Sequence, residues 1–308
     1  MRELVLKRVL LSLVTIIVLV VAVFFLGRLS GNPAVLFLRD GSTQEDLERI
    51  TAAFGLDRPL PEQFVEFVSH AVRGDLGDSL RQRRPAIEVV FEGVIPTLQL
   101  AGTALALVLV LGVPLGILAA LRRDRISDRL IRFFVVLGQA IPNFWLAIML
   151  ILIFGVWLKW LPFAGLEGWQ GLVLPSVSLA MLPLAGVVRL IRAGMLESLG
   201  EDYVEFARSM GLRKRIINLR FALRNALIPV VTYLGFTFVS SFLTGAVVAE
   251  VIFSRPGIGR LAYEATVFRD FPVLQAATLL AGGLFVLGNF LVDLSYAWLD
   301  PRTRESQT

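Results

Sequence analysis

Hydrophobic residues gather in six long stretches, separated by shorter and more polar segments. An α-helix rises about 1.5 Å per residue, so crossing the hydrocarbon core of a membrane takes roughly 17 to 25 apolar residues. The stretches that reach this length are Val9–Leu26, Leu98–Leu121, Ile131–Phe154, Leu172–Leu190, Leu227–Val251 and Val273–Trp298. The pattern predicts an all-α integral membrane protein with six transmembrane helices.

The longest polar interval in the second half of the chain is residues 200–229. Apolar side chains recur there with the spacing of one face of an α-helix, at Tyr203, Phe206, Ala207 and Met210. Gly211 stands where the glycine that ends a helix is expected. A second short helical pattern follows, with Ile216, Leu219 and Leu223 on its apolar face. Two short amphipathic helices are therefore predicted in this interval.

The segment between the first two stretches predicts a small helical loop. Ser42 or Thr43 can cap the N-terminus of one helix, and Pro61 favours the first turn of another that ends at Gly74. The turn after Gly74 carries Asp75 and Asp78. The loop is either a lid on the outer membrane face or a docking surface for an extracytoplasmic partner, and in the second case Asp75 and Asp78 are the candidate docking residues.

Two apolar stretches contain residues that break or pack helices. Gly112 and Gly116 have the GxxxG spacing that lets two membrane helices approach closely. Pro142 predicts a kink beside the polar residues Gln139 and Asn143. Polar groups at membrane depth face either another helix or a wet cavity. The candidate residues of a translocation pathway are Gln139, Asn143, Ser240, Ser241 and Thr244; hydrogen bonding between helices is the alternative for all of them.

The composition indicates a membrane protein without catalytic chemistry of its own. Of 308 residues 56% are hydrophobic, with a mean hydropathy of +0.73, whereas soluble domains are about 45–50% apolar. The absence of cysteine excludes disulfides and zinc–thiolate sites, and the single histidine, His70, argues against a multi-histidine metal site or a Ser-His-Asp triad. No phosphate-binding glycine loop or nucleophile elbow occurs. We expect no catalytic residue, no metal ligand and no cofactor in this chain.

The positive charges predict the orientation in the membrane. The net charge is +5, and 18 of the 30 Lys and Arg residues lie in the N-terminal tail, the 122–132 connection, the 189–224 region and the C-terminus. Short cytoplasmic connections carry an excess of Lys and Arg. Both termini and the 200–229 interval are therefore expected in the cytoplasm, and this topology explains the basic total without a nucleic-acid partner.

The chain carries no evident energy source for transport. Asp293 is the one acid clearly inside an apolar stretch, and it is either a structural ion-pair partner or a proton relay. The 200–229 interval is either a surface that binds anionic lipid or one that a separate motor protein binds. Its acidic start at Glu201, Asp202 and Glu205 argues against a negatively charged lipid surface.

Several motifs resemble those of one transporter family. Glu205-Phe206-Ala207-x-x-x-Gly211 resembles the EAA loop of ABC importer membrane subunits, which docks on the ATPase. Further matches to the first permease subunit of dipeptide, oligopeptide and nickel importers are Gly74-Asp75-Leu76-Gly77-x-Ser79, Ile141-Pro142-x-Phe144-Trp145, Ala222-Leu223-Arg224-Asn225-Ala226, Glu250-x-Ile252-Phe253-Ser254-x-Pro256-Gly257, Asp270-Phe271-Pro272-Val273 and Asp300-Pro301-Arg302. Together they cover almost the whole chain.

This resemblance implies a type I importer permease in a bacterial inner membrane. It implies a heterodimer with a second homologous permease, two ATPase subunits that bind ATP and Mg, an extracytoplasmic substrate-binding protein, membrane lipid and a dipeptide or short oligopeptide cargo. The ATPase-coupling residues that it implies are Glu201, Asp202, Tyr203, Glu205, Phe206, Ala207, Met210, Gly211, Leu212 and Arg213. The expected parts are 1–27 (tail and first helix), 28–95 (outer loop), 96–299 (permease core, with the 200–229 coupling loop) and 300–308 (cytoplasmic tail).

The sequence departs from the family pattern at a few places. Phe206 replaces the first alanine of the EAA core, Phe221 stands where histidine is common, and the connection at residues 155–171 is short. These differences leave the cargo open between peptides, nickel and glutathione. A proton-coupled secondary transporter is the rival from another class, although six stretches without internal repeats do not favour it. A third hypothesis is that the chain is a structural membrane subunit with no translocation pathway of its own.

Overall fold

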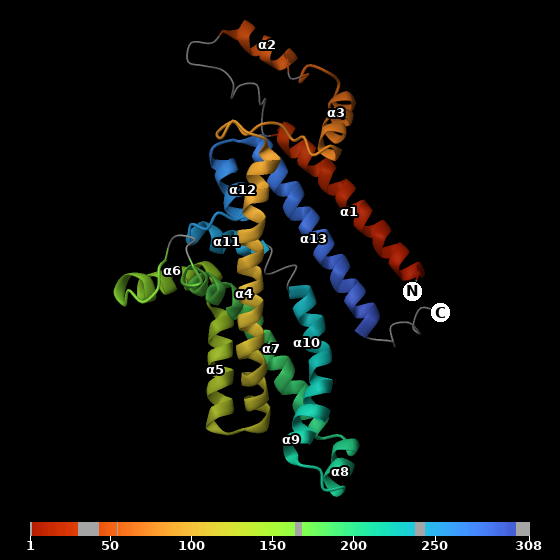
Figure 1. Ribbon diagram of the computed structural model, residues 1–308, viewed down its shortest axis with the longest axis vertical. Coiled ribbons are helices and arrows are strands. Elements are labelled where there is room, and N and C mark those ends of the chain that lie inside the picture. The colour runs from red at the N-terminus through yellow and green to blue at the C-terminus, as the bar shows by residue number, and fades with distance from the viewer. Residues whose placement is uncertain (1, 30–42, 54, 164–167, 238–243, 300–308) are drawn as a thin grey trace. The chain divides into compact units, whose positions relative to one another are not determined.

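The computed structural model describes residues 2–29, 43–53, 55–163, 168–237 and 244–299, and the regular elements there are helices (Figure 1). In chain order they are α1 (Arg2–Leu29), α2 (Gln44–Ala53), α3 (Leu60–Val72), α4 (Ala86–Leu121), α5 (Ile126–Ala140), α6 (Asn143–Leu150), the π-helical η2 (Ile151–Trp157), α7 (Gln170–Leu199), α8 (Asp202–Ser209), α9 (Lys214–Ile216), the π-helical η3 (Ile217–Ala222), α10 (Leu223–Thr237), α11 (Thr244–Ile252), α12 (Ile258–Val267) and α13 (Phe271–Leu299). An isolated antiparallel bridge joins Asp78 to Pro85.

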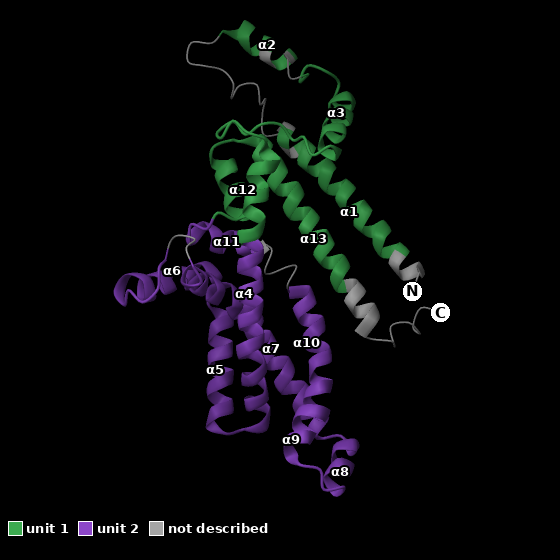
Figure 2. Cartoon of the chain, viewed as in Figure 1, with its two compact units in different colours: residues 1–96, 256–308 green, residues 97–255 purple. Residues whose placement is uncertain are grey.

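The chain divides into two units, and the division falls within α4 (Figure 2). Unit 1 comprises residues 1–96 and 256–308, and unit 2 comprises residues 97–255. In unit 1, α13 packs against α1 and α12, and α3 contacts α1. The ring of Phe24 on α1 lies against Phe64 and Phe67 of α3, with centroids 5.3 and 5.7 Å apart.

The core of unit 2 is built around α7. This helix packs against α10, α5, α6 and α11, and more than half of its residues are buried. The predicted close approach of α4 to a neighbouring helix is confirmed: a Cβ atom added at Gly116 would lie 2.8 Å from Ile191 Cβ, and one at Gly112 would lie 3.1 Å from Val187 Cγ1. Glycine at both positions therefore lets α4 and α7 pack with their backbones close together.

The number of membrane spans differs from the prediction. In the described residues, four helices are long and apolar enough to cross a membrane (α1, α4, α7 and α13), or five if a bent pair forms one span. The fifth apolar stretch contains α10 and α11, of 15 and 9 residues, and the residues between them lie outside the described part. Six spans are therefore not confirmed.

The third predicted span, residues 131–154, is wrong as a single helix. α5 ends at Ala140, and the axis turns by 105° before the helix formed by α6 and η2. Proline lacks an amide hydrogen and disfavours helical torsion angles in the preceding residue. Ile141 is accordingly extended, with φ −81° and ψ 124°. The kink expected at Pro142 is a complete break.

The two helices predicted in the 28–95 loop, α2 and α3, are confirmed, and the predicted local signals mark their ends. Thr43 Oγ1 accepts a hydrogen bond from the backbone N–H of Asp46 at 3.3 Å, and the backbone N–H of Thr43 donates to Asp46 Oδ2 at 2.9 Å. This reciprocal pair is a capping box. α3 has Pro61 in its first turn, and Gly74 beyond its end has a φ of +77°. The cap and the glycine therefore define these two helices from local sequence alone.

Candidate functional site

The predicted amphipathic helix at residues 203–210 is confirmed as α8. Glu201 precedes it in an extended conformation, and Asp202 and Glu205 place negative charge in its first turn, which the helix dipole favours. Gly211 ends the helix with a φ of +75°, and its backbone N–H donates to the carbonyl of Arg208 at 3.0 Å. The sequence signals at both ends therefore fix this short helix.

The apolar residues of α8 divide between two sides. Val204 and Ala207 are buried and form a small cluster with Ile217. Phe206 and Met210 are instead 66% and 67% exposed. The expectation of one apolar stripe is therefore wrong for Ala207, which packs against the rest of unit 2. Val204 was missed because the spacing was counted from Tyr203.

Hydrogen bonds attach α8 to its neighbours. The hydroxyl of Tyr203 is hydrogen-bonded to Ser198 Oγ near the end of α7 and accepts from Asn225 Nδ2 on α10 at 2.7 Å. Arg208 Nη2 reaches the carbonyl of Leu199 at 3.4 Å. α8 is therefore fixed to both α7 and α10 through Tyr203 near its start, and to α7 also through Arg208 in its last turn.

The exposed surface of α8 combines apolar and charged groups. Phe206 and Met210 lie on the same helix as the exposed carboxylates of Glu201, Asp202 and Glu205. The residues just after α8 are also exposed, namely Leu212, Arg213, Lys214 and Arg215. An exposed aromatic side chain with charged residues around it is typical of a protein-binding surface. The predicted coupling residues are thus exposed, except that Ala207 belongs to the interior.

Two candidate pathway residues line one cavity in unit 2. This cavity, of about 340 Å³, lies at the break between α5 and α6 and includes Gln139, Asn143 and Ser178 among its lining residues. Asn143 Oδ1 is buried and has no hydrogen-bond partner among the described residues. Ser178, on α7, was missed because nothing local distinguishes it.

The remaining candidates for a pathway or relay are not described by the structure. Ser240 and Ser241 lie outside the described residues, and Thr244 begins α11 without a described side chain. Asp293 belongs to α13, but its side chain also lies outside the described part. Gly245, next to Thr244, borders the cavity.

The two candidate docking carboxylates of the outer loop have different surroundings. Asp75 Oδ2 is hydrogen-bonded to His70 Nδ1 at 2.9 Å, and Asp75 Oδ1 accepts from the backbone N–H of Gly77 at 3.1 Å. These bonds, the one with His70 first, lower the pKa of Asp75. Asp78 is exposed beside its bridge to Pro85. Asp75 is therefore engaged in the turn, whereas Asp78 is free to contact another molecule.

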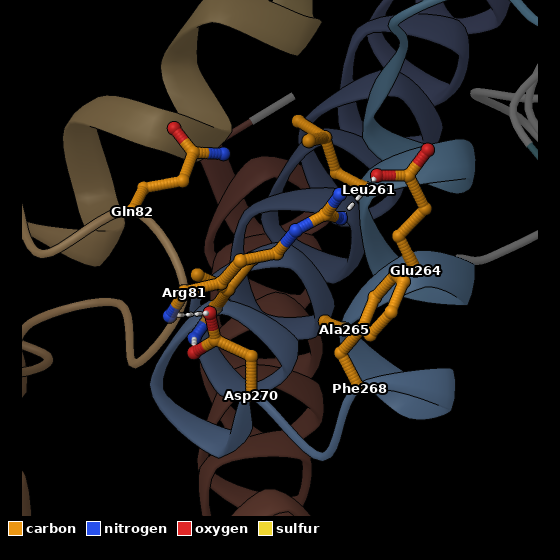
Figure 3. A pocket seen from close by; sticks show the side chains of 8 residues that line it. Arg81, Gln82, Leu261, Glu264, Ala265, Phe268 and Asp270 are labelled. Carbon is orange, nitrogen blue, oxygen red and sulfur yellow. Dashed lines mark hydrogen bonds and ion pairs between the residues drawn. The ribbon is translucent and has the colours of Figure 1, made fainter.

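Asp270 joins two distant segments of unit 1, a contact that the motif at residues 270–273 did not predict. Its buried carboxylate accepts from Ser79 Oγ at 2.6 Å and from the backbone N–H of Leu80 at 3.2 Å. Arg81 of the same turn donates to Glu264 at 3.2 Å and covers the ring of Phe268 at 4.2 Å (Figure 3). These contacts join segments about 190 residues apart, for which one sequence offers no signal.

Comparison with known proteins finds two matching family models and several relatives. Residues 112–305 match the family described as binding-protein-dependent transport system inner membrane component, and residues 1–98 match the N-terminal domain of such membrane components. The glutathione transport system permease protein GsiC of Escherichia coli (strain K12) is 39% identical over 97% of this chain and 98% of its own length, and that of Shigella boydii is 38% identical over the same shares. The crystal structure of an amino acid ABC transporter with histidines matches with a TM-score of 0.52, at 18% identity, over 69% of this chain and 94% of that one.

Proposed function

Since this chain belongs to the family of binding-protein-dependent transport system inner membrane components, we propose that it forms part of the translocation pathway for short peptides. It is a permease subunit of an ABC importer, with the all-helical fold of that class. Its place is the bacterial inner membrane. The proposal adds six membrane spans and two cytoplasmic termini, supported by the distribution of Lys and Arg.

The proposed cargo is a short peptide, with glutathione as the first candidate. Two observations support it: the sequence motifs shared with peptide-importer permeases, and relatives of 39% identity that are glutathione transport permeases. Glutathione is itself a tripeptide, so both observations favour the same chemistry. Nickel is the second candidate within the same branch.

The single observation that carries the coupling role is the exposure of Phe206 and Met210 on a helix whose other side is packed. We infer that this surface binds one of two ATPase subunits, which hold ATP and Mg outside this chain. Exposed aromatic anchors surrounded by charge suit a protein partner better than a lipid surface. A second homologous permease and an extracytoplasmic substrate-binding protein complete the proposed complex.

We expect the assembled transporter to import labelled glutathione or a dipeptide into proteoliposomes only when ATP is supplied on the α8 side. A proton ionophore should not change the rate, because no proton gradient drives the cycle. The control is the same complex with a non-hydrolysable ATP analogue. Uptake that needs no ATP and stops with the ionophore would contradict the proposal and favour a proton-coupled carrier.

A charge reversal at Asp78 is expected to weaken docking of the substrate-binding protein. Asp78 is exposed, so Asp78→Lys changes the charge of the outer loop without removing a hydrogen bond of the turn. Asp75→Lys should have the larger effect, because it also removes the bonds to His70 and Gly77. The affinity of the substrate-binding protein for the transporter, measured at two salt concentrations, tests this prediction. Unchanged affinity in both variants would favour the alternative that the loop is a lid.

A further inference from the structure

A buried ion pair joins α5 to α7 within unit 2. Asp128, in the first turn of α5, is fully buried. It accepts hydrogen bonds from Arg192 Nε at 2.8 Å and Arg192 Nη2 at 2.9 Å. The backbone N–H of Asp124 donates to the same carboxylate at 3.0 Å, and Arg132 Nε lies 3.4 Å from it. A two-point contact between arginine and a carboxylate fixes orientation as well as distance.

The same two helices also meet near the other end of α5. A Cβ atom added at Gly138 would lie 2.9 Å from Met181 Cγ, so the backbone of α5 approaches α7 closely there. Along the chain, Gly138 follows Asp128 while Met181 precedes Arg192, by about 15 Å of helix in each case. α5 is therefore antiparallel to α7 and attached to it near both of its ends.

The contact between α5 and α7 lies between the two candidate sites of unit 2, which are the α8 surface and the cavity at Gln139 and Asn143. Arg192 is on the last two turns of α7, which lead into α8, and Tyr203 bonds α8 back to Ser198. At its other end α5 stops at the break beside the cavity lined by Gln139 and Asn143. α7 borders the same cavity through Ser178 and Met181, so the ion pair holds together two helices that line it.

We propose that Asp128 and Arg192 are positioning residues that make α5 follow α7 and α8, so that movement imposed by the ATPase carries both sides of the cavity, at Gln139 and at Ser178, together. This inference rests on the proposed function. Stability alone is a weak reason for such a pair, because buried ion pairs are often no more stabilising than apolar residues of similar volume. Their contribution here is a fixed orientation between two helices.

Removing both charges together separates positioning from stability. Neutralising Asp128 alone leaves Arg192 without its carboxylate, and neutralising Arg192 alone leaves the buried Asp128 with only the longer ionic contact to Arg132. Either single change is therefore expected to destabilise the protein whatever the role of the pair. The double variant Asp128→Asn with Arg192→Gln leaves neutral groups that still form hydrogen bonds. We expect it to assemble in near-normal amounts, so that its transport properties can be measured.

The first measurement follows the distance between α8 and α5. Because the chain contains no cysteine, spin labels can be placed at Ser209→Cys on α8 and at Val136→Cys, an exposed position on α5. With the native pair, the distance is expected to change by less than about one helical turn, 5.4 Å, between the nucleotide-free and ATP-bound transporter. In the double variant it should change by more.

The second measurement is the amount of labelled glutathione or dipeptide imported per ATP hydrolysed. This ratio is expected to fall at least about fivefold in the double variant, because fivefold is the lower end of the effects that distant coupled sites have on each other. Arg129→Gln is the matched control, because it removes the charge of an exposed arginine next to Asp128 in α5 and changes neither member of the pair. That control should behave like the native chain.

Two results would overturn the inference: a double variant with the native label distance in both states, or one with native import per ATP. A label distance that changes by more than one helical turn in the native complex would also overturn the inference, because α5 would then not follow α8. A native complex that hydrolyses no ATP would overturn the proposed function itself and this inference with it.

Discussion

Replacement of Phe206 by aspartate is expected to leave the permease in the membrane at near-normal amounts, while the binding protein no longer stimulates ATP hydrolysis. Phe206 is 66% exposed and is not part of the cluster formed by Val204, Ala207 and Ile217, so the fold does not depend on it. An aromatic anchor at the centre of an interface contributes about 2 kcal/mol or more, which corresponds to docking weakened by about 30-fold. A carboxylate buried there without a partner adds a further penalty.

The measurement is the ATPase rate of the reconstituted transporter with and without the binding protein. Phe206→Leu is the matched control, because it keeps an apolar side chain on the same surface and should retain most of the stimulation. Equal stimulation in Phe206→Asp and the native chain would show that this side of α8 does not bind the ATPase.

Two further substitutions test the same surface through its geometry and charge. Gly211→Pro removes the N–H that donates to Arg208 and cannot adopt the φ of +75°, so the end of α8 must change. Glu205→Arg reverses an exposed charge in the first turn of α8. Both variants are expected to uncouple ATP hydrolysis while permease abundance stays near normal, and full stimulation in both would refute the role of α8.

Replacement of Gly116 by alanine is expected to lower the stability of the permease, although alanine favours helices. The added Cβ would lie 2.8 Å from Ile191 Cβ and 2.9 Å from Ile191 Cγ2, closer than real side chains pack. α4 and α7 must then separate, and overpacking of this kind costs about 1–3 kcal/mol. The melting temperature of the purified permease in detergent should fall accordingly.

Gly102 supplies the matched control on the same helix. A Cβ atom added there would have no atom of another described element within 4 Å, so Gly102→Ala changes helix propensity without changing the packing of the described residues. Its melting temperature should equal or exceed that of the native chain. If Gly116→Ala and Gly102→Ala melt alike, the close approach of α4 to α7 does not contribute to stability.

Local sequence signals predicted the elements that local interactions determine. The cap at Thr43, the proline at Pro61 and the glycine at Gly211 each act within one or two helical turns, so the sequence alone gives α2, α3 and α8 nearly to the residue. The spacing of Gly112 and Gly116 likewise predicted a close helix contact.

Contacts between distant residues could not be predicted in this way. The carboxylate of Asp270 binds a turn near residue 80, and Asp128 binds Arg192, but no local pattern in the sequence predicts either contact. The break after Ala140 was expected only as a kink, because proline indicates where a helix is interrupted but not the angle that the packing of α6 imposes. Val204 was missed because two overlapping stripes fit the same eight residues.

The π-helical segment η3 gives the chain between α8 and α10 room to lose one residue. A π-helical turn holds about one more residue than an α-helical turn, so deletion of one residue from Ile217–Ala222 can convert the segment to an α-helix. Ala226 and Val230 would then keep their places in the core around α7. Homologues are therefore expected to differ by one residue in length here, whereas a deletion within the α-helical part of α10 would rotate everything after it by about 100°.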